Sequence, residues 1–88
     1  MSGPPVKHSL SLKGHRTSVS LEDPFWTEFR RIAAREGRAL NDLAAEIDAA
    51  RAPEVGLASA IRVFVLERVR AERDQPRSAS AGNVSNSQ

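Results

Sequence analysis

The chain contains no cysteine, so disulfide bonds and thiolate metal ligands are both excluded. It has only two histidines, His8 and His15, and no cluster of acidic residues accompanies them, so we expect no metal site and no cofactor. No apolar run approaches the length of a membrane span, and the first residues lack both the basic and the apolar region of a secretion signal. We therefore expect a cytoplasmic protein that makes no contact with membranes.

Acidic residues are missing from the first 21 positions, where Lys7, Lys13 and Arg16 are the only formally charged side chains. The net charge of the 88 residues is only +2, and from residue 22 to residue 73 the charges nearly cancel. An anionic partner would therefore meet the N-terminal part of the chain, although three basic residues also serve simply to keep a segment soluble. A chain of this length forms one small domain with a modest core, which association between copies would help to stabilise.

A strand is predicted over residues 15–21, because apolar and polar residues alternate there. One side of the strand carries Thr17, Val19 and Leu21, and the other carries Arg16, Ser18 and Ser20. A lone strand leaves its backbone amides and carbonyls unpaired, so it needs a partner. The sequence offers two partners: residues 9–12, joined through Lys13 and Gly14 as a short hairpin, or the same strand of a second copy.

Three helices are predicted after this strand. Asp23 is expected to cap the first, which begins at Pro24 and ends before Gly37. Its aromatic residues recur at core spacing, which favours a buried stripe over a surface on which bases stack. A second helix is predicted over residues 40–51, and a third, over residues 57–73, has apolar residues on more than one side, which indicates a subunit interface. We expect a flexible arm over residues 1–8, a folded domain over residues 9–73 and a disordered tail over residues 74–88.

This order of strand, Asp-Pro helix start, Gly37 turn and second helix resembles the ribbon-helix-helix family of bacterial DNA-binding proteins, to which the Arc and methionine repressors belong. The resemblance covers about residues 14–52. More narrowly, the segment GHRTSVSLE at residues 14–22, followed by Phe25-Trp26 and by LASAIRVFVL at residues 57–66, looks like a subgroup of small proteobacterial members. The resemblance implies a mainly α fold with one short strand, paired with the same strand of a second copy, and with an additional C-terminal helix.

In that family the paired strands form a ribbon that enters the major groove of DNA. The resemblance therefore implies that Arg16, Ser18 and Ser20 contact bases, and an arginine can make two hydrogen bonds to one guanine. It also implies phosphate contacts around the start of the second helix. The corresponding residues are Lys13, Arg38, Ala39, Leu40 and Asn41. Ala39 stands where members often have a Ser or Thr cap, at a cost of about 1 kcal/mol, and Asn41 either meets a phosphate or bonds nearby backbone. The core shared by two subunits would contain Val19, Leu21, Phe29, Ile32, Leu43, Ile47, Ile61 and Phe64.

We therefore expect a homodimeric regulator of transcription, of the repressor type, that binds double-stranded DNA as a dimer or as a dimer of dimers. An enzyme is not expected, because the acidic residues of the helices are interleaved with arginines as on solvated surfaces. The alternative is a protein-interaction module or a ribbon-helix-helix antitoxin. In that case the third helix or the tail would bind a protein partner.

Overall fold

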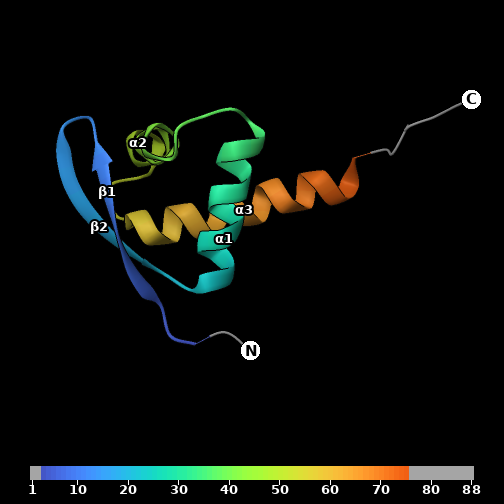
Figure 1. Ribbon diagram of the computed structural model, residues 1–88, viewed down its shortest axis with the longest axis horizontal. Helices are drawn as coiled ribbons and strands as arrows, with labels where there is room; N and C mark the ends of the chain where they lie inside the picture. Colours follow the sequence, from blue (N-terminus) through green and yellow to red (C-terminus); the bar gives the residue numbers. More distant parts are fainter. Residues whose placement is uncertain (1–2, 76–88) are drawn as a thin grey trace, which may run out of the picture.

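The computed structural model describes residues 3–75, which form a two-stranded antiparallel sheet followed by three helices. The strands are β1 (Val6–Leu12) and β2 (His15–Leu21), and the helices are α1 (Asp23–Arg35), α2 (Leu40–Ala50) and α3 (Leu57–Asp74). Figure 1 shows the hairpin at one side of the molecule and the second half of α3 extending away from it. No helix within residues 3–75 is long and apolar enough to cross a lipid bilayer.

The expected single strand is in fact the second strand of a hairpin. β2 has the predicted bounds, but β1 pairs with it along its whole length, from Leu12 opposite His15 to Val6 opposite Leu21. β1 thus begins within the segment expected to be a flexible arm, because its alternation continues to Val6 and each residue gains a cross-strand partner. Lys13 and Gly14 form the turn with φ values of 51° and 88°. Positive φ at both central positions is what a type I′ hairpin turn requires.

The first helix begins one residue earlier than predicted. Asp23 is its first residue rather than its cap, Glu22 occupies the cap position, and neither provides a side-chain cap. The Glu22 carboxylate does not cap the helix because it accepts a hydrogen bond from Arg62 on α3, a residue far away in the sequence. The other end is as predicted: Gly37 has a φ of 67°, and the amides of Gly37 and Arg38 donate to the carbonyls of Ala34 and Ala33. This pair of bonds is a Schellman motif, which needs a left-handed residue after the helix.

The remaining helices agree with their predicted ranges to within one residue. α2 ends at Ala50, and α3 extends to Asp74, the first residue of the expected tail. Residues 76–88 of that tail lie outside the described residues.

One apolar core lies between the inner face of the hairpin and the three helices. Its buried members are Leu10, Leu12, Val19, Leu21, Phe29, Ile32, Ala33, Leu43, Ala44, Ala45, Ile47, Ile61 and Val65. All the residues expected in a core shared by two subunits are therefore buried within this one chain, except Phe64, which is partly buried. The core interpretation of the aromatic stripe is confirmed for Phe29, which has no exposed surface. Trp26 is partly buried and stacks on His8 of β1, with ring centroids 3.8 Å apart.

Candidate nucleic-acid interface

The outer face of the hairpin is polar and exposed. It carries Lys7, Ser9 and Ser11 on β1, and Arg16, Ser18 and Ser20 on β2. The inner face carries the buried residues Leu10, Leu12, Val19 and Leu21. Because successive side chains of a strand point to opposite faces, the same alternation that builds the core also gathers these six polar side chains on one surface.

The sequence predicts only the β2 half of this face. Lys7 lies in the segment expected to be a flexible arm, and Ser9 and Ser11 lie in the segment that was only one of two possible partners for β2. A signal was present, since Lys-x-Ser-x-Ser in β1 has the same spacing as Arg-x-Ser-x-Ser in β2. The predicted base contacts of Arg16, Ser18 and Ser20 stay a prediction, but their exposure is what such contacts require.

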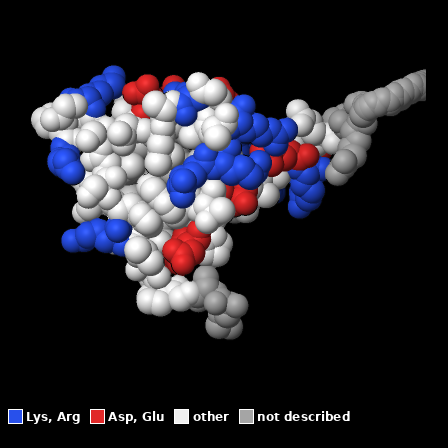
Figure 2. Space-filling model, viewed as in Figure 1, with Lys and Arg blue, Asp and Glu red and all other residues white. Residues whose placement is uncertain are grey.

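The two basic residues of this face have unneutralised charges. Among the described residues, no ion pair includes Lys7 or Arg16. The first acid after the ribbon, Glu22, is paired with Arg62 at 2.9 Å, and this hydrogen bond lowers the pKa of the Glu22 carboxyl. Figure 2 shows the contrast in one view: on the hairpin side the basic side chains lie apart in a largely uncharged surface, whereas basic and acidic side chains are interleaved over the helices.

Both outer edges of the hairpin are contacted by helices. On the β1 edge, the Ser11 amide donates to Oδ1 of Asn41, in the first turn of α2, at 3.1 Å. On the β2 edge, the Arg62 guanidinium of α3 donates to the Ser20 carbonyl at 3.2 Å. These bonds satisfy backbone groups that would otherwise be open to another strand.

The start of α2 lies beside β1, with the expected phosphate-binding residues 38–41 together. Ala39 is its N-cap and provides no side-chain bond, as predicted. Asn41 bonds backbone, although that of a distant strand, and an amide whose oxygen accepts still has two N–H groups to donate. Arg38 is engaged by both carboxylate oxygens of Glu46 at 3.0 Å, which raises the pKa of Arg38.

Acidic side chains reduce the attraction of this corner for phosphate. Glu36 also lies 3.9 Å from Arg38, and a shallow hollow beside the hairpin turn is lined by Lys13 together with Asp42 and Glu46. A phosphate here would have to compete with carboxylates for Arg38 and Lys13. Phosphate contacts by Lys13, Arg38, Ala39, Leu40 and Asn41 stay a prediction.

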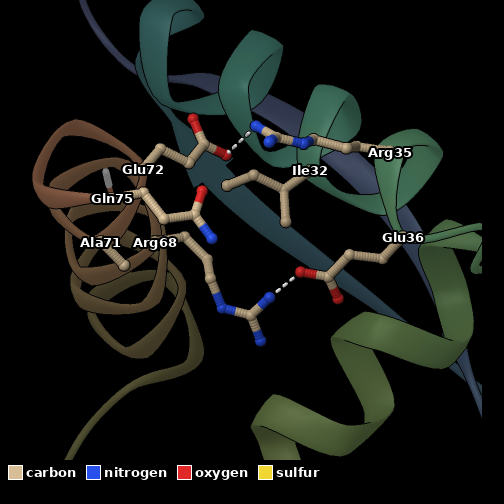
Figure 3. Close-up of a pocket in the computed structure, with 7 residues that line it drawn as sticks. All are labelled: Ile32, Arg35, Glu36, Arg68, Ala71, Glu72 and Gln75. Atoms are coloured by element: carbon tan, nitrogen blue, oxygen red, sulfur yellow. Dashed lines mark ion pairs between the residues drawn. The ribbon is translucent and has the colours of Figure 1, made fainter. Parts of the chain in front are cut away.

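A charged cleft of about 260 Å³ separates the C-terminal ends of α1 and α3. Figure 3 shows Ile32 in it and two ion pairs across it: Arg35 with Glu72 at 2.8 Å, and Arg68 with Glu36. Both carboxylates of the cleft are held in ion pairs, and the described residues that line it include no serine, threonine, histidine or lysine. The ion pairs across the cleft hold α1 and α3 together.

An apolar groove lies between the end of α2 and the first half of α3. Its lining residues are Ile47, Ala50, Arg51, Val55, Ala60, Val63, Phe64 and Glu67. Val63 is 55% exposed, and Leu66, one turn further along α3, is 51% exposed. The predicted apolar character of α3 on two sides is confirmed: one side is in the core, and the other is open to solvent.

A polar ribbon packed on a helix–turn–helix pair is the arrangement that the family resemblance implied, and the family comparison agrees. A model of the ribbon-helix-helix domain matches residues 5–69. The chain belongs to the ribbon-helix-helix family. The match begins before β1 and ends within α3, so both are parts of this ribbon-helix-helix domain rather than additions to it. No curated protein and no solved structure is significantly similar to the chain. Ribbon-helix-helix domains are generally DNA-binding regulators of transcription and are typically not enzymes.

Proposed function

We propose that this ribbon-helix-helix protein regulates transcription, as a repressor, by binding double-stranded DNA sequence-specifically with the outer face of its hairpin in the major groove. The observation that carries the proposal is the exposed face on which Arg16, Ser18 and Ser20 stand without an acidic neighbour on either strand. A two-stranded ribbon fits the major groove, where Arg16 can make two hydrogen bonds to a guanine and the serines can donate or accept. Phosphate contacts would supply much of the affinity and make it salt-dependent.

The proposal is tested by selecting duplexes from a random pool and measuring their affinities by fluorescence anisotropy at two salt concentrations. The Arg16→Ala variant should bind the selected duplex roughly 5- to 150-fold more weakly, which corresponds to about 1–3 kcal/mol. Arg30→Ala is the matched control, because it removes the same charge from an exposed site on α1. Absence of any preferred duplex, or equal losses in the two variants, would contradict reading by the ribbon.

We also propose that two copies associate through α3, since ribbon-helix-helix proteins usually bind DNA as dimers. Val63 and Leu66 are exposed apolar residues that lie about one turn apart on α3. In an antiparallel contact between two α3 helices, Val63 would meet Leu66 of the second copy. The segment is thus complementary to itself in apolarity, as a twofold interface must be.

Sedimentation of the wild type and of Leu66→Lys tests this association. The wild type should sediment as a dimer and Leu66→Lys as a monomer, while Ala34→Lys, which adds the same charge to an exposed position of α1, should remain a dimer. A monomeric wild type, or a Leu66→Lys dimer, would show that α3 is not the interface. The alternative function, a protein-interaction module or antitoxin, is favoured by the same apolar surface and would be supported by a folded protein that binds no DNA even at low salt.

A further inference from the structure

The two strands of the hairpin repeat one pattern. β1 reads Val-Lys-His-Ser-Leu-Ser-Leu and β2 reads His-Arg-Thr-Ser-Val-Ser-Leu. Both have a basic residue second, serines fourth and sixth, and apolar residues fifth and seventh. Their exposure follows the same order, from two exposed residues to a buried seventh. Each strand therefore presents one basic residue and two serines to the outer face, and two buried apolar residues to the inner face.

The antiparallel register turns this repeat into an approximate twofold symmetry. Ser9 lies opposite Ser18 at the centre, Lys7 lies opposite Ser20, and Ser11 lies opposite Arg16. A half-turn about the centre exchanges Lys7 with Arg16 and Ser11 with Ser20. One basic residue therefore stands at each diagonal end of the outer face. The positions of Lys7 and Ser11 differ by four residues, so the basic ends are about 14 Å apart along the strands, or roughly four base pairs.

The contacts at the edges follow the same symmetry. Ser11 on the β1 edge and Ser20 on the β2 edge are equivalent positions, and each has a backbone group bonded by a helical side chain, Asn41 and Arg62 respectively. A second copy that paired its β2 with this β2 would have to displace Arg62 from the Ser20 carbonyl. Both edges of the single-chain hairpin are therefore flanked by a helix.

The width of the sheet also favours a ribbon from one chain. Strands lie about 4.8 Å apart, so a sheet of four strands, made by pairing β2 with a second β2, would span about 14 Å between its outer strand axes. The major groove is about 12 Å wide and admits two strands. The hairpin of a single chain fits this limit, whereas a four-stranded sheet does not.

We infer that one chain supplies the whole DNA-reading ribbon, with β1 presenting Lys7, Ser9 and Ser11 to the bases beside the three residues of β2. The inference rests on the proposed function and deepens it. The target is a short DNA sequence with imperfect twofold symmetry, because the two ends of the ribbon are similar but carry different basic residues. Each chain then has a complete ribbon of its own, so a dimer joined through α3 has two ribbons and can bind two short duplexes.

The experiment compares Lys7→Ala with Arg16→Ala by repeating the duplex selection with each variant. Each should relax base preference in one half of the selected site, the two halves being different, and weaken binding to the wild-type site roughly 5- to 150-fold. Arg30→Ala, on α1, should change neither half. Native mass spectrometry of the wild type with an excess of a single-site duplex should saturate at one duplex for each chain, which is two duplexes on a dimer.

Two results would overturn the single-chain ribbon and leave the proposed function standing. One is that Arg16→Ala relaxes both halves of the site while Lys7→Ala relaxes neither, as expected of a ribbon made of two β2 strands. The other is a complex that saturates at one duplex for two chains when the single-site duplex is in excess. Failure of the wild type to prefer any duplex would instead overturn the proposed function, and the single-chain ribbon with it.

Discussion

Truncation of Ile61 tests whether α3 belongs to the domain or is only attached to it. Ile61 has no exposed surface, and it lies in α3, which packs against both other helices and β2. Replacing a buried isoleucine by alanine costs about 2–5 kcal/mol, and complete burial in a core of one chain favours a value of about 3–4 kcal/mol. A small domain is stable by only about 5–15 kcal/mol, so Ile61→Ala should lose a large share of its free energy of unfolding.

Urea unfolding followed by far-ultraviolet circular dichroism measures this loss. Arg70→Ala is the control on the same helix, because Arg70 is exposed and because arginine and alanine both have a high helix propensity. This variant should change the free energy of unfolding by no more than about 0.5 kcal/mol. If Ile61→Ala were no less stable than Arg70→Ala, α3 would not be packed into the core, and the argument that one chain closes its own core would fail.

Three further predictions concern single contacts. Gly37→Ala should lower the free energy of unfolding by about 1–2 kcal/mol, because alanine is strained at a φ of +67°; Gly3→Ala, outside the helices and strands and with open space around it, should lose much less in the same urea experiment. Lys13→Asn should raise the midpoint of thermal unfolding, because asparagine tolerates the positive φ of a type I′ turn better than lysine does; an unchanged or lower midpoint would contradict this turn geometry. Since Arg62 lowers the pKa of Glu22 in the folded state, the pair stabilises the protein above the ordinary carboxyl pKa of 4.5 and loses this effect as the pH falls through the lowered value; urea titrations across this range should show a smaller acid loss in Arg62→Met, and equal losses would contradict the pairing.

The local patterns of the sequence were sufficient for β2 and for most helix ends. Alternation over seven residues defines both the bounds of β2 and the two faces of the strand, and Gly37 after an apolar helical stripe identifies the Schellman turn. β1 was harder, because Pro4 and Pro5 precede it and the alternation of residues 6–8 is weaker than that of residues 9–12. Its first residues are held by pairing with Ser20 and Leu21, which is a contact between segments and not a property of either one.

For the site, the sequence identified which residues face outward, but not which side chains bond the two edges of the hairpin. Arg16, Ser18 and Ser20 follow from alternation, and the β1 half could have been found by comparing the chain with itself. The bonds from Asn41 and Arg62 could not, since they join residues 30 and 42 positions apart in the chain. The same holds for the start of α1, where a partner on α3 draws the Glu22 carboxylate away from the helix end it would otherwise cap.

The cleft between α1 and α3 gives the two halves of α3 different responses to salt. The first half is anchored by Ile61 and Val65 in the core, whereas Glu72 near the other end is held by ion pairs with Arg31 and Arg35. Added salt weakens partly exposed ion pairs but leaves buried apolar contacts in place. A salt titration of DNA binding will therefore also loosen the last turns of α3, and hydrogen exchange there should accelerate while that of the ribbon does not. The slope of affinity against salt will count released counterions correctly only if this end of the helix is far from the DNA.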